Sequence, residues 1–376
     1  MNNGKRADRP LRIVHAANFG FKPVKAFIHN SAAKLSNGMI RGGHNVVNFS
    51  VRDVARWSGP FGNRPLGSRS ARHILLSYCR AARPDVLVLG HADLIDAETI
   101  LRIRADLPQL KVMQWNVDWI AEDGEAVAGD FTARSNRDKI LAKNACVDAT
   151  FVSTGGPSLR RLAESLTGAT AFLPNAADPS IETARNFERE DLPTSVFFAS
   201  SSDDTRRFHA GGWRDMRGMV ADLRRTVPEA VVAAYGLDGI PPVYGPGLQD
   251  ALEAAKIGLN ISRRNDIFLY SSDRIAQTAG NGLVVCIDRA SGFDTVFGDD
   301  EFIFYRTEDE LFATIDRLVG DDAARRAMAQ RSWARYHELF GCQPVARYML
   351  DVLFEEHDPA DYVWPTLAGV HPGDGA

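Results

Sequence analysis

Short, continuous apolar runs alternate with segments of helical spacing along the first half of the chain, and this rhythm constrains the fold more than any other feature. The apolar runs lie at 11–17, 44–51, 85–89, 111–115 and 149–153. Each run has the length of a buried strand, and apolar residues at helical spacing separate one run from the next. Strands that alternate with helices form βαβ units, in which the strands lie parallel. The sequence therefore predicts a doubly wound, Rossmann-like α/β domain over 11–175.

The same rhythm begins again after an interruption. Residues 176–194 are rich in Asn, Asp, Glu and Pro, which is typical of an interdomain linker. Apolar runs return at 195–201 and 230–236, with a helix expected through "GWRDMRGMVADLRRTVPE" between them. A chain of 376 residues is also too long for one hydrophobic core. We therefore expect a second Rossmann-like domain over 195–344, with parallel sheets in both domains and a cleft between the two.

The ends of the chain differ from these two domains. Residues 1–10 are polar and basic, which is typical of a disordered lead-in. A helical pattern over 345–360 predicts a C-terminal helix that is placed to cross back onto the first domain. Residues 361–376 are expected to form a loose tail.

The balance of charge and the cysteines exclude some classes of protein. The chain has 44 Lys and Arg against 48 Asp and Glu, which gives a formal net charge of −4. A general nucleic-acid-binding protein needs a large basic face, so nucleic acid is not an expected partner. The four cysteines form no CxxC pair, which favours neither zinc nor disulfides and fits a reducing compartment. Because no apolar run reaches membrane-spanning length, we expect a cytoplasmic protein, with at most peripheral association at the inner membrane face.

Several common catalytic motifs are missing. The loop after the first strand lacks GxGxxG, and the chain contains no GxxxxGK[ST], HExxH or GxSxG. These absences argue against dinucleotide redox chemistry, P-loop phosphate transfer, a zincin-type metal site and a hydrolase nucleophile elbow. The sequence therefore predicts an activity without a bound metal or cofactor.

Polar residues at the strand ends of the first domain are candidates for a site, because ligands bind beyond the carboxyl ends of parallel strands. Asn18 follows the first strand, His91 the third, and Asn116 and Asp118 the fourth. Asp118 lies between two tryptophans, the first of which is Trp115, and aromatic rings beside a carboxylate suit a sugar. The same pattern fits a helix N-cap with aromatic packing, and His91 fits a hydrogen-bonded structural histidine.

Basic residues at strand ends and helix starts dominate the second domain. Small hydroxyl residues that include Ser201, then Arg206 and Arg207, follow the strand "SVFFAS". Arg263 follows the strand "IGLN", and Arg274 opens the next helix. Arginine recognises phosphate in a bidentate manner, and small residues let backbone N–H groups approach an anion. Each arginine alone also fits a solvated side chain, but together they favour a diphosphate pocket.

The segment "LQDALEAAKIGLNISRRNDIFLYSSDRIAQTAGNGLVVCID" resembles the C-terminal half of GT-B glycosyltransferases, closest to the CgeB-like group, or glycosyl transferases group 1. Arg274 matches the arginine of that group, Gln277 stands where the group has glutamate, and Gly282 matches its turn glycine. "FLPNAADPS" and the closing "EFIFYRTEDELFATIDRLVGDDAARRAMAQRSWARYHELF" also match. The resemblance covers 145–345 closely, and 10–120 as architecture alone.

The resemblance implies a nucleotide-sugar-dependent glycosyltransferase that works without a metal. Its donor would lie against the C-terminal domain, and a saccharide, lipid-linked or other acceptor against the N-terminal one. Gln277 would contact the ribose, although it lacks the charge of glutamate, and Leu269 stands where retaining relatives have a second glutamate. The implied donor-binding residues are Ser201, Arg206, Arg263, Arg274, Gln277 and Gly282. On the acceptor side, Asp118 and then His91 are the candidates for a general base, beside Asn18, Trp115 and Asn116.

Two other hypotheses use the same fold. A nucleotide-sugar 2-epimerase would need acid and base side chains at the cleft and would release a free epimerised sugar nucleotide. A glycosyltransferase-like binding subunit would have lost turnover, which the residues at 269 and 277 allow. The donor sugar, the nucleotide, the acceptor, the stereochemical outcome and the oligomeric state are left open by the sequence.

Overall fold

The computed structural model describes residues 9–21, 30–120, 131–201 and 204–367. The chain divides into two compact units. Unit 1 comprises Met1–Pro174 together with Cys342–Ala376, and unit 2 comprises Asn175–Gly341. Each unit has its own parallel sheet, which confirms the predicted α/β class with two Rossmann-like domains in tandem.

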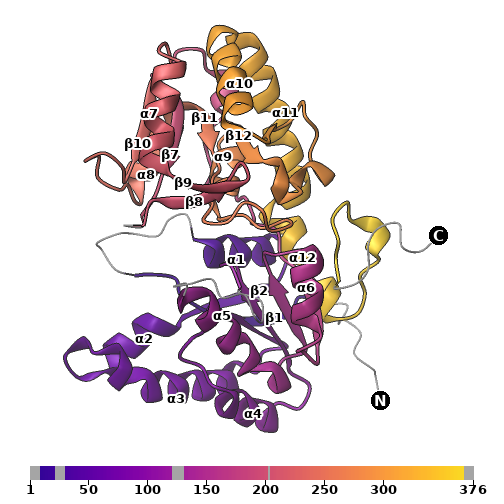
Figure 1. Ribbon diagram of the computed structural model, residues 1–376. Coiled ribbons are helices and arrows are strands. Elements are labelled where there is room, and N and C mark those ends of the chain that lie inside the picture. Colours follow the sequence, from indigo (N-terminus) through magenta and orange to yellow (C-terminus); the bar gives the residue numbers. More distant parts are fainter. Residues whose placement is uncertain (1–8, 22–29, 121–130, 202–203, 368–376) are drawn as a thin grey trace. The chain divides into compact units, whose positions relative to one another are not determined.

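Unit 1 is built on a six-stranded sheet in the order β2-β1-β3-β4-β5-β6 (Figure 1). Its strands are β1 (Arg12–Ala17), β2 (Asn45–Ser50), β3 (Val86–Gly90), β4 (Lys111–Asn116), β5 (Ala149–Val152) and β6 (Ala169–Phe172). All of the neighbouring pairs are parallel. Its helices are α1 (Ser31–Arg41), α2 (Val51–Ser58), α3 (Arg64–Ala82), α4 (Ala97–Asp106), α5 (Phe131–Leu141), α6 (Gly156–Ala163) and α12 (Cys342–Leu353). Every residue of β3 is buried, as expected for a parallel strand covered on both faces.

Helix α12 lies at the far end of the chain but belongs to unit 1. It packs along α1 and also contacts β5 and β6. The two helices approach so closely that a Cβ on Gly38 of α1 would lie 2.0 Å from the carbonyl oxygen of Cys342. The segment beyond α12 is held to it as well. The Tyr348 hydroxyl of α12 donates to the backbone oxygen of Thr366, which also accepts from the Phe172 N–H of β6. The last 26 described residues, 342–367, are therefore part of the packing of unit 1.

Unit 2 is built on a five-stranded sheet in the order β10-β7-β11-β12-β13, with all neighbours parallel. Its strands are β7 (Thr194–Ala199), β10 (Val232–Tyr235), β11 (Ala255–Leu259), β12 (Val284–Asp288) and β13 (Ile303–Tyr305). Its helices are α7 (Met216–Thr226), α8 (Pro246–Glu253), α9 (Arg274–Gly280), α10 (Glu308–Gly320) and α11 (Asp322–Phe340). A separate antiparallel hairpin joins β8 (Arg206–His209) to β9 (Gly212–Asp215).

The start of the helix predicted at Gly212 is wrong, because the first four residues of that segment form β9. The helix begins only at Met216, where the Asp215 carboxylate caps it by accepting from the Arg217 N–H at 2.8 Å. The four residues of β9, Gly-Trp-Arg-Asp, are too few to show the apolar alternation by which a strand is predicted from sequence.

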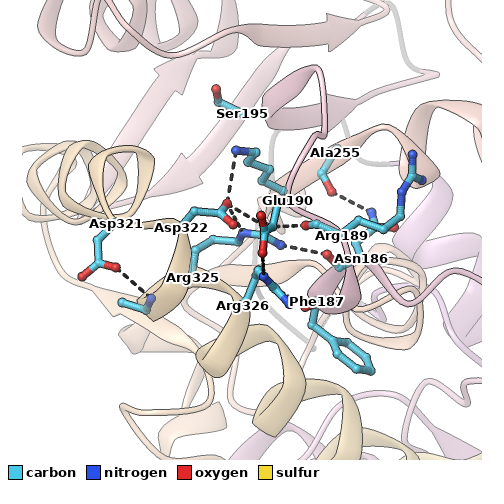
Figure 2. Close-up of polar contacts among 12 residues, drawn as sticks. Asn186, Phe187, Arg189, Glu190, Ser195, Ala255, Asp321, Asp322, Arg325 and Arg326 are labelled. Atoms are coloured by element: carbon cyan, nitrogen blue, oxygen red, sulfur yellow. Dashed lines mark hydrogen bonds and ion pairs between the residues drawn. The ribbon is translucent and has the colours of Figure 1, made fainter.

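The segment expected to be a linker lies within unit 2 and is held there by α11 (Figure 2). The Arg325 side chain, fully buried, donates to the backbone oxygens of Asn186 and Arg189 at 2.9 and 2.8 Å and pairs with Asp322. Arg326 donates to the backbone oxygen of Phe187 and pairs with Glu190. Backbone carbonyls of an irregular segment need such partners when they are buried, and these two arginines supply them.

Candidate functional site

Two arginines meet at the carboxyl ends of β7 and β11 in unit 2. Arg207 is only 6% exposed, and its guanidinium donates to the Ser200 hydroxyl at 2.9 Å and to the backbone oxygen of Asp204 at 2.8 Å. Arg274, the first residue of α9, donates to the backbone oxygens of Ala199 at 2.7 Å and Ile261 at 3.1 Å. Arg274 therefore links the last residue of β7 to the loop that follows β11.

The positive charges of this region act on one another. Burial, together with the nearby charge of Arg207, lowers the pKa of Arg274 to about 10. Burial also lowers the pKa of Arg207, with an added contribution from Arg263. Arg263 forms an ion pair with Asp204 at 3.1 Å. We call Arg207, Arg263 and Arg274 the arginine cluster.

Like charges that are held together by burial and backbone hydrogen bonds repel, and an anion relieves that repulsion. Arg274 stays protonated at neutral pH, since a pKa of about 10 lies well above it. The cluster therefore offers a phosphate group positive charge and N–H donors at the edge of the sheet where α/β proteins bind ligands.

The other donor-side candidates are distributed more widely. Arg206 is exposed and lies over the Trp213 ring, 5.5 Å from its centroid. Ser201 is exposed in the loop after β7. Gln277 follows Arg274 by one turn of α9, and its side-chain amide lies 3.4 Å from the Asp273 carboxylate. Arg206 and Arg207 point to opposite faces of β8 because they are consecutive residues of one strand, which is why the buried partner of Arg274 is Arg207.

Gly282 lies at the other end of α9 from the cluster. Its φ of +74° is left-handed, and a Cβ there would lie 2.8 Å from the Phe187 ring and 3.0 Å from the Asn186 nitrogen. The glycine is needed so that the chain can turn from α9 into β12 against Phe187. The structure thus brings Arg263 and Arg274 together with Arg207 but places Gly282 apart from them.

The acceptor-side candidates gather around a pocket of about 160 Å³ in unit 1. The pocket lies at the carboxyl ends of β3 and β4. Its lining includes His91, Trp115, Asn116 and Asp118, and further Arg52, Leu89, Ala92, Asp93, Gln114, Asn136, Lys139, Ile140 and Lys143. Asn18 is not among the lining residues; its backbone oxygen accepts from the Asn30 side chain at 2.7 Å.

His91 and Asp118 face each other in this pocket. The His91 Nδ1 lies 3.7 Å from the Asp118 carboxylate, and the Val117 N–H donates to Nε2 at 3.4 Å. An accepting Nε2 places the proton on Nδ1, toward the carboxylate. Burial lowers the pKa of His91, and the negative charge of Asp118 opposes part of that shift. Since both ring nitrogens of His91 are engaged in this way, the exposed Asp118 carboxylate is the acceptor of the pair that a substrate proton can reach.

Trp115 and Asn116 support the pocket wall. Trp115 is only 4% exposed, and its indole N–H donates to His15 Nε2 at 3.0 Å. Its ring lies directly on Gly90, where a Cβ would come within 2.2 Å of it. The Asn116 side chain accepts from the Asp118 N–H at 2.8 Å and so fixes the loop that carries the carboxylate.

Two residues of the pocket carry chemistry that the sequence did not single out. Lys143 is 6% exposed, and its ammonium donates to the Lys139 backbone oxygen at 2.6 Å. Burial lowers its pKa to about 8, with Asp93 opposing the shift. Asn136 of α5 is also buried, at 4% exposed. Asn136 lies in α5 and Lys143 just after its end, and no sequence pattern predicts that this segment covers the pocket.

Across the described ranges, no group of three or more His, Cys, Asp or Glu side chains could hold a metal ion. No helix in this part of the chain is long and apolar enough to cross a membrane.

Comparisons with known proteins agree with this architecture. Residues 206–351 match a protein-family profile described as "Glycosyl transferase-like". No curated protein has a sequence that matches the chain.

Solved structures resemble the chain over nearly its whole length. An α-glucosyltransferase bound to UDP and a 13-mer DNA containing a HMU base has a TM-score of 0.60 at 10% identity, covering 92% of this chain and 99% of that one. HepE of Anabaena, bound to UDP and glucose, has a TM-score of 0.56 at 11% identity, covering 92% and 100%. A protein assigned as a UDP-N-acetylglucosamine 2-epimerase from Listeria monocytogenes has a TM-score of 0.54 at 14% identity, covering 93% and 98%.

At these identities the likeness shows the fold, and the narrower resemblance to the CgeB-like group stays a prediction. The two parallel-sheet domains, the family profile and the structural neighbours all agree. The chain therefore has the GT-B fold, and its residues 206–351 are similar to the glycosyl transferase-like family.

Proposed function

We propose that this protein is a glycosyltransferase that uses a nucleoside diphosphate sugar, with the diphosphate bound by the arginine cluster and without a metal ion. The observation that carries the proposal is the mutual positive charge of Arg207, Arg263 and Arg274 at the carboxyl ends of β7 and β11. When the sugar leaves, negative charge develops on the departing diphosphate. Fixed positive charges at that position stabilise the transition state, which is the role that a metal plays in other enzymes.

The unit 1 pocket is the proposed acceptor site. An acceptor hydroxyl of a saccharide or lipid-linked molecule would form the new bond to the anomeric carbon while the bond to the diphosphate oxygen breaks. In an inverting reaction the hydroxyl proton passes to a base. The Asp118 carboxylate is the proposed base, because the His91 Nε2 lone pair already accepts from the Val117 N–H and Nδ1 carries the proton that faces Asp118. Lys139 and Lys143 add positive charge to the pocket wall, which suits an acceptor with a negatively charged group, whereas Arg52 is paired with Asp93.

The donor proposal is tested first by thermal shift with UDP, GDP, CMP, ADP and dTDP. A nucleotide that binds the native state raises the melting temperature by mass action, so a responder identifies the donor class. Arg274→Gln is then compared with wild type by calorimetry, using the responding nucleotide and its unphosphorylated nucleoside. We expect the nucleotide to lose about 1.5–3 kcal/mol of binding free energy, the range for charge-assisted hydrogen bonds, and the nucleoside to lose little.

Arg263→Gln and Arg317→Gln complete this experiment. Arg263 is 41% exposed, so its replacement should leave the fold intact while it weakens nucleotide binding. Arg317 is exposed on α10 and serves as the matched control. Equal nucleotide affinity in folded wild type, Arg263→Gln and Arg274→Gln would refute the arginine cluster as the diphosphate site.

Product analysis separates this proposal from the two others that share the fold. Incubation with the identified donor should release the nucleoside diphosphate in step with glycosylated acceptor. A free epimerised sugar nucleotide, formed without acceptor, would instead show an epimerase. Tight donor binding with neither product nor donor hydrolysis would show a binding subunit.

A further inference from the structure

Helices α2 and α3 of unit 1 form a hairpin whose connecting turn projects from the rest of the unit (Figure 1). The turn is the short 3-10 helix Pro60–Gly62. Three of the most exposed apolar side chains in the described part of the chain lie at this end: Trp57 is 71% exposed, Phe61 fully exposed, and Leu66 63% exposed. Phe21, 59% exposed, stacks on Trp57 with ring centroids 6.0 Å apart. We call Phe21, Trp57, Phe61 and Leu66 the aromatic tip.

The tip is rigidly built. Phe61 has φ 56° and ψ 24°, a left-handed conformation that a bulky residue rarely adopts and that its surroundings must enforce. The two helices touch through glycines: a Cβ on Gly67 would lie 1.7 Å from the Ala55 oxygen, and one on Gly59 2.1 Å from the Asn63 oxygen. The Asn63 side chain caps α3 by accepting from the Leu66 N–H. A tip held in this way loses little conformational entropy when it inserts into a partner.

The hairpin is also strongly basic. Residues 54–84 contain six arginines and no Asp or Glu, in a chain whose formal net charge is −4. Arg56, Arg72 and Arg80 pair with carboxylates that lie outside this segment. Arg64 and Arg69, beside the tip, form no ion pair with any residue that the structure describes. The tip is thus flanked by positive charge that none of the described residues neutralises.

We propose that the aromatic tip docks onto the surface of an anionic lipid bilayer. Tryptophan and phenylalanine side chains insert at the headgroup boundary of a bilayer, and flanking arginines bind its phosphates. Nucleic acid would also attract the arginines, but it gives no reason for Leu66 and Phe61 to be exposed on a rigid projection. Docking through the aromatic tip would hold the protein at a membrane surface, and it does not depend on which nucleotide unit 2 binds.

The apolar part of the proposal is tested by flotation of the full chain with vesicles of phosphatidylcholine, alone or mixed with phosphatidylglycerol. Wild type should float with the mixed vesicles, and Phe61→Ser should lower the partition constant by about tenfold, as expected for one lost apolar anchor. Phe61 is fully exposed in the protein, so this change does not remove core packing. Leu101→Ser, at a leucine 54% exposed on α4, is the matched control and should float like wild type.

The charged part is tested with Arg64→Gln and Arg69→Gln against the control Arg102→Gln, an exposed arginine of α4. The first two should weaken binding to mixed vesicles, and the control should not.

Failure of wild type to float, or equal flotation of wild type and Phe61→Ser, would overturn the proposal. Binding of duplex DNA in place of vesicles, with Phe61→Ser unaffected, would assign the hairpin to nucleic acid. Nucleotide binding should be the same in Phe61→Ser and wild type, which keeps this result separate from the donor site.

Discussion

His15 lies at the centre of a buried chain of hydrogen bonds in unit 1. It accepts from the Trp115 indole through Nε2 and contacts the Ser36 hydroxyl through Nδ1 at 2.8 Å, and Ser36 donates to Asn48 at 2.7 Å. Its side chain has no exposed surface, and burial lowers its pKa to about 3. His15 is therefore neutral in the folded protein at weakly acidic and neutral pH. Its Nε2 holds the Trp115 indole, which forms part of the wall of the unit 1 pocket.

This histidine makes the stability of unit 1 depend on pH. The unfolded chain binds a proton at His15 below about pH 6.5, while the folded chain does not, so the free energy of unfolding falls as the pH is lowered. We expect denaturant unfolding of wild type between about pH 6 and pH 4 to lose roughly 1 kcal/mol per pH unit more than a His15→Gln variant. Parallel pH profiles for the two proteins would show that His15 is protonated in the folded state.

Consecutive basic residues could be found from the sequence, but not the role of each. The run that contains Arg206 and Arg207 predicts a diphosphate pocket and favours Arg206, whereas the structure places Arg207 beside Arg274. In a strand, successive side chains point to opposite faces, so only one of two neighbours can face the sheet edge. Which one does so depends on how β8 pairs with the residues that follow β11, where Phe208 bridges Arg264, and this pairing is a tertiary contact.

At the scale of elements, the turn between α9 and β12 is set by Gly282. Its left-handed φ and the nearby Phe187 ring leave no room for a side chain. Gly282→Ala should destabilise unit 2 by about 1–3 kcal/mol in denaturant unfolding, through backbone strain and the clash with Phe187. Gly320→Ala is the matched control, since no atom lies within 4 Å of its Cβ position, and it should be neutral or stabilising.

The same variant separates two roles for this glycine. Because Gly282 lies at the end of α9 away from Arg274, the folded Gly282→Ala protein should bind the nucleotide as wild type does. A selective loss of nucleotide affinity without loss of stability would return Gly282 to the donor site.

The strands with continuous apolar sequences could be predicted, and the short polar strands β8 and β9 could not. The strands of both main sheets read as apolar runs because helices cover them on both faces. The β8–β9 hairpin carries arginines and an exposed tryptophan, so it lacks that signal. Its turn residues Ala210 and Gly211 have φ of 49° and 80°, the positive values of a two-residue hairpin turn, and "HAGGW" was the one local hint.

At the scale of the whole molecule, unit 1 is assembled from both ends of the chain. The sequence predicts a helix after the second domain that crosses back onto the first, but no period or motif says which elements of the first domain it contacts. The contact depends on Gly38 of α1, because any side chain at that position would clash with the backbone of α12. Residues 342–367 are therefore as much a part of the first domain as its own strands.

Truncation tests this dependence. A chain that ends at Gly341 loses α12 and the contacts of Tyr348 and Thr366, so α1, β5 and β6 become exposed. Hydrogen exchange followed by mass spectrometry should then show loss of protection across unit 1, while β7, β11 and β12 keep theirs because unit 2 has its own core. A chain that ends at Leu367 keeps every contact described for unit 1 and should exchange like the full protein. Unchanged protection of α1 in the shorter chain would mean that unit 1 folds without its C-terminal segment, and a loss that spread equally over both units would mean that the two fold as one cooperative body.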